Sequence, residues 1–159
     1  AHHRQVWVLG DCQALVDSIL HTARKDVDVL METLRAFLLE ADELRQTEGE
    51  AVRLLEPIMQ LQPLFQNNNR AKGFWYPALD GFLTDVCAIK VIPLGSDPIE
   101  VVLATDGYPV LTATLKESEQ LLAKLLENDP LCFRENRTTK GLTPGNLSYD
   151  DRTYLRLFV

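Results

Sequence analysis

The sequence predicts a single domain of the α+β class that spans residues 1–159. Short apolar runs rich in β-branched residues, such as the run that begins at Ile99, are typical of buried strands. Longer segments with an apolar residue at every third or fourth position are typical of amphipathic helices that cover a sheet. A chain of 159 residues with 46% hydrophobic content is also long and apolar enough to bury a core.

Four strands are predicted before residue 95. We expect a hairpin with strands at Gln5–Leu9 and Gln13–Val16, joined by a turn at Gly10-Asp11. Phe74–Tyr76 is an aromatic, strongly β-prone triplet. Val86–Leu94 is a further strand, ended by a turn cluster of Gly, Ser, Asp and Pro.

Two helical segments lie between these strands. The first opens at Lys25 and Asp26 and ends at a break over 47–50; its predicted core face carries Leu30, Leu34, Phe37, Leu38, Ala41 and Leu44. The second carries Ala51, Leu54, Leu55, Ile58 and Met59. Pro57 lies inside the second segment, where it either kinks the helix or begins a new one.

A third helix follows the strand that begins at Ile99. Thr114 and Glu117 form a capping box at its start, and apolar spacing continues to about Asn128, before Pro130 stops it. Residues 129–146 are expected to form a loop, which contains the most cationic local run of the chain, Arg134, Arg137 and Lys140. Such a run is usually a solvated loop, but near a metal site it can also meet an anionic substrate.

Acidic residues stand at the ends of three predicted strands. The run from Ile99 leads into Asp106-Gly107, the first strand leads into Gly10-Asp11, and Asp150-Asp151 precede a final strand over Arg152–Val159. A carboxylate at the end of a buried strand is costly unless it is paired, hydrogen-bonded or bound to a cation. The alternative is that each acid only begins a turn or caps a helix, since Asp-Gly is a common turn dipeptide.

Composition excludes several classes of function. The net charge of −7 argues against a nucleic-acid groove and agrees better with a cation site. The apolar runs are too short to cross a membrane and no signal peptide opens the chain, so we expect a cytoplasmic protein that binds neither membrane nor nucleic acid. Cys12, Cys87 and Cys132 are widely spaced, which suggests reduced, buried thiols and no zinc site.

The order of the three acidic motifs resembles the metal-dependent protein phosphatases of the 2C type. The likeness is carried by VWVLGDCQ, VVLATDGYPVLTATLKESEQLL and SYDDRTYLRLF, whereas the segment 25–69 matches in arrangement only. The resemblance implies an α-β-β-α sandwich and a site for Mg²⁺ or Mn²⁺. It also implies that the N-terminal part of the fold, with the first metal ligands and a phosphate-binding Arg, lies outside these 159 residues.

The resemblance assigns the acids residue by residue. Asp106 and Asp150 match the ligands of two metal ions, and Asp11 matches an acid linked to a third ion. Cys12 stands where that family usually has Ser, and Asp151 stands where it usually has Asn, so Asp151 can take the place of Asp150 if the register differs by one. Oxygen ligands without His or Cys favour Mg²⁺ or Mn²⁺ over zinc.

The implied activity is hydrolysis of phosphate monoesters by a water activated between two metal ions, as in serine/threonine protein phosphatases. The substrate would be a phosphorylated protein or a small phosphomonoester, and we expect no useful activity from this chain alone. Two alternatives stay open. One is a binding or regulatory module that keeps the phosphatase fold without turnover, and the other is an α+β domain with capped turns and no metal.

Overall fold

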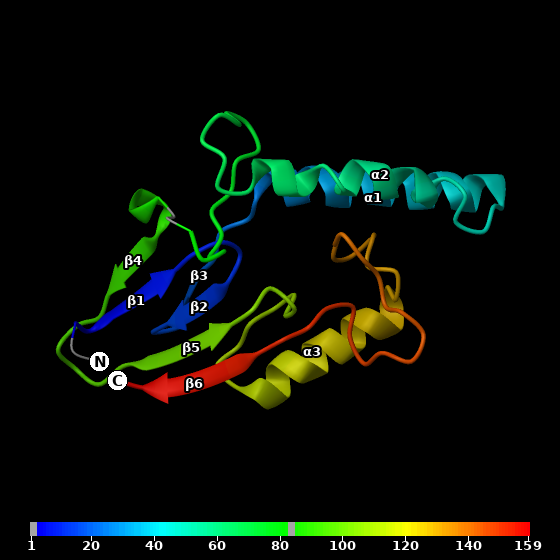
Figure 1. The fold of residues 1–159 in the computed structure, drawn as a ribbon. Coiled ribbons are helices and arrows are strands. Elements are labelled where there is room, and N and C mark those ends of the chain that lie inside the picture. Colours follow the sequence, from blue (N-terminus) through cyan, green and yellow to red (C-terminus); the bar gives the residue numbers. More distant parts are fainter. Residues whose placement is uncertain (1–2, 83–84) are drawn as a thin grey trace. The chain divides into compact units, whose positions relative to one another are not determined.

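The computed structural model describes residues 3–82 and 85–159, which belong to two compact units. The strand unit comprises Ala1–Ala23, Pro77–Lys124 and Asp150–Val159, and the helical unit comprises Arg24–Tyr76 and Leu125–Tyr149. Figure 1 labels the helices and strands along the chain. The protein is of the α+β class, because antiparallel sheets and helices both contribute to it.

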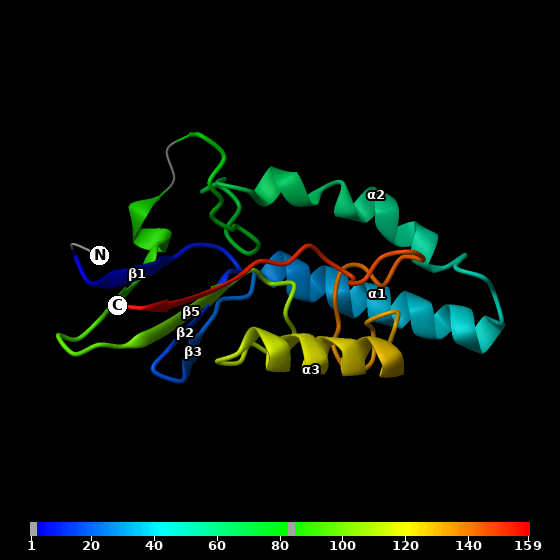
Figure 2. The same cartoon turned by 90° about the horizontal axis from the view of Figure 1, so that it is seen from below.

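The strand unit contains two antiparallel sheets. The smaller pairs β1 with β4, and the larger has the strand order β3-β2-β5-β6 (Figures 1 and 2). The strands are β1 (Gln5–Val8), β2 (Gln13–Val16), β3 (Ile19–His21), β4 (Lys90–Pro93), β5 (Glu100–Ala104) and β6 (Tyr154–Phe158). Their shared core consists of Val6, Val8, Ala14, Val16, Ile92 and Val101.

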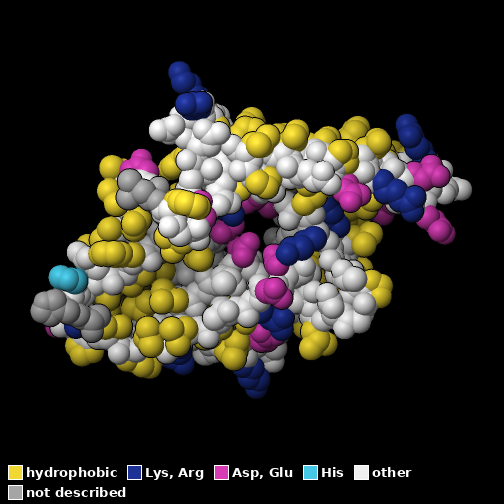
Figure 3. Space-filling model, viewed as in Figure 1, with side chains coloured by type: hydrophobic (Ala, Val, Ile, Leu, Met, Phe, Trp, Pro, Cys, Tyr) yellow, Lys and Arg dark blue, Asp and Glu magenta, His cyan; other side chains and the backbone are white. Residues whose placement is uncertain are grey.

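The smaller sheet buries one face and exposes the other. Val6, Val8 and Ile92 are buried, whereas the alternate residues Trp7 and Val91 keep 65% and 48% of their surface exposed. This alternation follows from the period of two along a strand. Figure 3 shows hydrophobic side chains gathered over these strands on the visible face.

The predicted hairpin between the first two strands is wrong. β1 pairs with β4, and β2 pairs instead with β3 and β5. The hairpin of this region is β2–β3, in which Val16 faces Ile19 across a turn at Asp17 and Ser18. Both turn residues have positive φ, 48° and 63°, which suits the right-handed twist of the two strands. The Gly10-Asp11 turn therefore carries the chain from one sheet to the other.

Two further strand predictions differ from the structure. Phe74–Tyr76 is not a strand, and its only pairing among the described residues is an isolated bridge between Tyr76 and Gln66. The predicted strand Val86–Leu94 begins with a 3₁₀ turn over Val86–Ala88, and only Lys90–Pro93 pairs in a sheet. β5 and β6 lie where the sequence predicts them.

The helical unit begins with α1 (Asp26–Arg45), which confirms the first predicted helix. A 3₁₀ turn (Val52–Leu55), α2 (Glu56–Met59) and a second 3₁₀ turn (Gln62–Phe65) follow. Pro57 lies in the first turn of α2, where a missing N–H costs no hydrogen bond, so it begins a helix. The first 3₁₀ turn packs against α1.

The buried face of α1 overlaps only partly with the predicted one, because Leu38 is buried but Leu30 is exposed. Phe37 and Leu44 are 65% and 82% exposed, although the sequence places both on the core face. The residues that α1 buries are Val27, Met31, Arg35, Ala36, Leu38, Leu39 and Asp42. Two of these are charged, and a count of apolar residues therefore selects a face rotated from the true one.

Arg35 is buried because it binds the carbonyl groups of the loop after α3 (Leu115–Asn128). Its Nη1 donates to the carbonyls of Leu131, Cys132 and Thr138 at 2.8, 3.2 and 3.3 Å. Burial lowers the pKa of Arg35, and the Cys132 and Asp129 side chains oppose that shift. All residues of 129–146 are described, and they form the predicted loop without a helix or strand.

Asp129 organises the same loop from its beginning. Its carboxylate accepts hydrogen bonds from the amides of Phe133, Arg134 and Glu135 at 3.0, 2.8 and 2.9 Å. Burial favours the neutral acid, but the amide hydrogen bonds outweigh it and hold the pKa of Asp129 below its ordinary value.

α3 begins as predicted, since the Thr114 hydroxyl accepts from the Glu117 amide at 3.3 Å. The expectation of three buried thiols is correct only for Cys132, because Cys12 and Cys87 are exposed. No helix within the described residues is long and apolar enough to cross a membrane.

We expect Asp42→Asn to make the stability of the protein less dependent on pH. The Asp42 carboxylate accepts from Thr47 Oγ1 at 2.6 Å and from the amides of Ala51 and Val52 at 2.8 and 3.1 Å. The Thr47 hydrogen bond is the main reason that the pKa of Asp42 lies below its ordinary value of 3.8. A lowered pKa stabilises the fold above 3.8, and this stabilisation is lost as pH falls through the folded-state value.

Urea unfolding at a series of pH values between neutral and acidic conditions measures this effect. The difference in unfolding free energy between wild type and Asp42→Asn should be largest near neutral pH and shrink in acid. Glu40→Gln removes an exposed acid from the same helix and serves as the control for the loss of one negative charge. A difference for Asp42→Asn that stays constant across the series would contradict the role of its carboxylate.

Candidate functional site

The register of the larger sheet brings the three acid-bearing turns to one end of it. Gln13, the first residue of β2, faces Ala104, the last residue of β5, and Ala104 also faces Tyr154, the first residue of β6. β2 and β6 therefore begin where β5 ends. We call this place the acidic end, defined by the turns at Gly10-Asp11, Asp106-Gly107 and Asp150-Asp151.

The predicted ligands are less buried than the sequence suggests. Asp106 is exposed, whereas Asp11 and Asp150 are half-buried, and Asp151 is exposed. The Asp150 carboxylate accepts from the Asp151 amide at 2.8 Å, a local turn contact. The argument from burial therefore does not apply to Asp106, and its position at the acidic end is what supports it as a ligand.

The Asp106 and Asp150 turns are in backbone contact. A Cβ atom placed on Gly107 would lie 2.5 Å from the Asp151 carbonyl oxygen and 2.9 Å from the Arg152 Cβ. Next to this contact, the Thr105 amide donates to the Thr153 carbonyl at 3.2 Å. Only a glycine allows this approach, which gives the Asp-Gly dipeptide a reason beyond a common turn.

Gln13 ties the start of β2 to the Asp106 turn. Its buried Nε2 donates to the carbonyls of Thr105 at 3.1 Å and Tyr108 at 2.8 Å, which flank Asp106 and Gly107. The turn is therefore held on both sides of the acid by one side chain. Sequence reasoning missed Gln13, because a polar residue inside a strand gives no sign of a partner more than 90 positions away.

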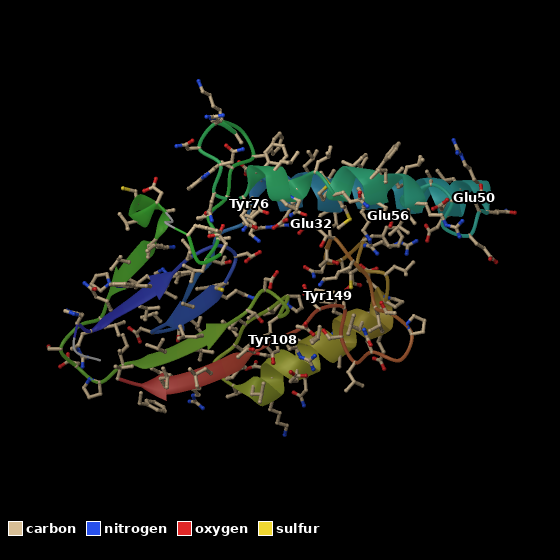
Figure 4. The ribbon with its side chains drawn as sticks, viewed as in Figure 1. Glu32, Glu50, Glu56, Tyr76, Tyr108 and Tyr149 are labelled. Carbon is tan, nitrogen blue, oxygen red and sulfur yellow. The ribbon has the colours of Figure 1, made fainter. Side chains whose placement is uncertain are left out.

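A group of three side chains lies beside the two turns and joins them to α3. The Tyr108 hydroxyl donates to Glu119 Oε1 at 2.7 Å, and Figure 4 shows Tyr108 beside α3. Arg152 donates from Nε to Glu119 Oε1 and from Nη2 to Oε2, both at 2.8 Å. Two parallel hydrogen bonds of this kind are among the strongest polar contacts in proteins.

The electrostatics of this group agree with its hydrogen bonds. Burial and the bond to Glu119 raise the pKa of Tyr108 to about 12. The hydrogen bond from Arg152 lowers the pKa of Glu119, and the same bond raises the pKa of Arg152. Glu119 and Arg152 are thus charged and Tyr108 is neutral at physiological pH, so this group is a fixed ion pair with a donor.

Sequence reasoning missed these three residues, because Glu119 lies 11 positions from Tyr108 and 33 from Arg152. Glu119 reads as one more polar residue on the solvent face of an amphipathic helix. A signal exists only in the spacing, since Tyr108 follows Asp106 by two residues and Arg152 follows Asp150 by two residues.

The donor set at the acidic end suits a hard divalent cation. Carboxylates and backbone carbonyls are the oxygen ligands that Mg²⁺ and Mn²⁺ prefer, and Mg²⁺ commonly binds through one or two carboxylates with water in its other positions. Within residues 3–82 and 85–159, no group of three or more His, Cys, Asp or Glu side chains that could hold a metal ion is present. Asp11, Asp106 and Asp150 therefore share one end of a sheet without forming a three-acid cluster.

The helical unit contains a separate recess of about 410 Å³ between α1 and the loop over 129–146. Phe37, Phe133, Arg134 and Arg137 contribute to its walls. Arg134 pairs with Glu43 at 2.5 Å and its guanidinium stacks over the Phe133 ring, 4.2 Å from the centroid. The cationic character expected for this loop is therefore partly neutralised by α1.

Comparisons of the chain with protein-family models, curated proteins and solved structures found no match. The resemblance to metal-dependent phosphatases rests on the three motifs themselves.

Gly107→Ala should destabilise the protein by about 1–3 kcal/mol, the usual cost of forcing an extra methyl into a packed site. The added Cβ would meet the Asp151 carbonyl oxygen at 2.5 Å, and two backbone segments must move apart to admit it. Urea unfolding of wild type and variant measures the loss.

Gly95→Ala is the matched control, because a Cβ there meets nothing within 4 Å. Its effect should stay within about 0.5 kcal/mol of zero, as for most surface substitutions. Equal unfolding free energies for the Gly107 and Gly95 variants would show that the two acid-bearing turns are not in contact.

Proposed function

We propose that this chain is part of a metal-dependent phosphatase that hydrolyses phosphate monoesters. In this proposal Asp106 and Asp150 are ligands of Mg²⁺ or Mn²⁺, and Asp11 lies at the same site. The observation that carries the proposal is the register of β2, β5 and β6, which brings all three acid-bearing turns to one end of the sheet. The substrate class is a phosphorylated protein or a small phosphomonoester.

The chemistry of the donors supports this assignment. A bound divalent ion would supply a hydroxide at neutral pH and stabilise the charge that develops on a phosphoryl group. The residues of this chain would hold and orient that ion: Asp106 from the turn after β5, and Asp150 from the turn before β6. Gln13 would fix the Asp106 turn through its two hydrogen bonds to backbone carbonyls.

A second candidate is a binding or regulatory module with the same fold and no turnover. The observation that favours it is the shortage of clustered acids, because fewer than three metal-binding side chains gather at any one place in the described residues. Two carboxylates suffice to bind an ion, whereas clamping both the attacking and the leaving oxygen takes two ions. The two candidates share ion binding and differ in turnover.

Millimolar Mn²⁺ or Mg²⁺ should raise the melting temperature of the chain, and Asp106→Asn should abolish the rise. An ion that binds only the folded form stabilises it by about 2.7 kcal/mol at a hundredfold excess over its dissociation constant. Without metal, Asp106→Asn should be at least as stable as wild type, because it removes one of several like charges at the acidic end. Thermal unfolding with and without the ion measures both effects.

Asp97→Asn is the control for this experiment, since Asp97 is an exposed turn acid before the opposite end of β5. Its ion-dependent rise should equal that of wild type. If the ion left the melting temperature of wild type unchanged, or raised that of Asp106→Asn equally, the acids would be turn and cap residues only.

The isolated 159-residue chain should not hydrolyse p-nitrophenyl phosphate above the rate of Asp106→Asn, even with saturating Mn²⁺. The described residues contain no group of three or more metal-binding side chains, so this chain lacks the ligands for two ions. Without them it lacks the positioning and charge stabilisation that speed phosphoryl transfer. Release of p-nitrophenol measures the rate. Strong turnover that depends on Asp106 would show that the ligand set is complete in this chain, and it would exclude the non-catalytic module.

A further inference from the structure

The two turns that carry Asp106 and Asp150 are fastened to the same carboxylate. Tyr108 stands two residues after Asp106 and donates to Glu119 at 2.7 Å. Arg152 stands two residues after Asp150 and donates to both oxygens of Glu119 at 2.8 Å. Glu119 therefore accepts hydrogen bonds from a residue beside each acid-bearing turn, although it belongs to neither turn.

The Asp106 and Asp150 turns touch each other directly, so a residue that positions either turn also affects the distance between them. A Cβ on Gly107 would meet the backbone carbonyl of Asp151 and the Cβ of Arg152, so Gly107 lies directly against residues 151 and 152. The Thr153 amide donates to Thr105 Oγ1 at 3.0 Å on the same side. A small shift of either turn is therefore transmitted to the other, and with it to the two carboxylates.

Glu119 also determines which carboxylate the Arg152 guanidinium pairs with. Both Arg152 nitrogens that contact Glu119 are engaged in one bidentate pair, so this cation is neutralised by α3. If Glu119 were neutral, the Arg152 guanidinium would lose its charged partner, and Asp150 and Asp151 directly precede Arg152 in the sequence. The guanidinium would then compete with a divalent cation for those carboxylates, because opposite charges a few ångströms apart attract.

We propose that Glu119 is the positioning residue of the ion site: it sets the spacing of the Asp106 and Asp150 turns through Tyr108 and Arg152, and it holds the Arg152 cation away from the acids. This inference rests on the proposed ion binding at the acidic end. Glu119 itself is not a ligand in this proposal. Partners that bond directly to metal ligands commonly account for 10- to 100-fold in metal affinity. Glu119 acts one contact further out, so we expect an effect at the lower end of that range.

Calorimetric titration of the full 159-residue chain with MnCl₂ tests the proposal. Glu119→Gln should weaken Mn²⁺ binding by about 10-fold. Glu117→Gln removes the same charge from an exposed position of the same helix and should leave the affinity unchanged. Arg152→Gln should also weaken binding, and the Glu119→Gln/Arg152→Gln double variant should bind no more weakly than the weaker single variant, because both act through one contact.

Hydrogen exchange of the metal-free proteins separates positioning from general stability. Glu119→Gln should speed amide exchange at both 105–108 and 150–153, while exchange in β1 and β4 stays as in wild type. Uniformly faster exchange throughout the strand unit would overturn the proposal, since it would mean that Glu119 only stabilises the fold.

The titration also distinguishes this inference from the proposed function. Mn²⁺ binding by wild type with equal affinity in Glu119→Gln would overturn the role of Glu119 and leave the ion site standing. No Mn²⁺ binding by wild type would overturn the ion site, and the role of Glu119 toward it would fall as well.

Discussion

The antiparallel register of β2, β5 and β6 is the constraint on which the candidate site depends. Gln13 faces Ala104, and Ala104 faces Tyr154, so the acid-bearing turns that flank these residues share one end of the sheet. A shift of one residue in either pairing would turn the strand's core side chains to the other face. The buried residues Ala14, Val101 and Val102, which are at most 1% exposed, therefore fix the position of the acids.

Buried charged and polar side chains fasten the loops in both units. Gln13 holds the turn after β5, Arg35 holds the loop after α3, and Asp42 joins the end of α1 to the following 3₁₀ turn. Each of them replaces the hydrogen bonds that backbone groups would otherwise make with water. Buried polar groups of this kind require complete partners, which explains why each contacts two or three backbone groups.

The sequence and the structure single out Asp106 for different reasons. The sequence argues for a ligand because a charge at the end of a buried strand is costly, yet Asp106 is exposed. What distinguishes it is the glycine that follows, whose missing side chain lets two acid-bearing turns touch. The closeness of the Asp106 and Asp150 carboxylates remains a prediction, as does the phosphatase resemblance.

The sequence by itself determined the local elements: α1, α3, β5 and β6, and the cap at Thr114. These depend on periodicity and on residues within a few positions, which the sequence displays directly. Only the tertiary structure decided that β1 pairs with β4, that α1 buries Arg35 and Asp42, and that Glu119 binds Tyr108 and Arg152. Those outcomes depend on partners far away in the chain, and polar residues carry no local pattern that identifies a distant partner.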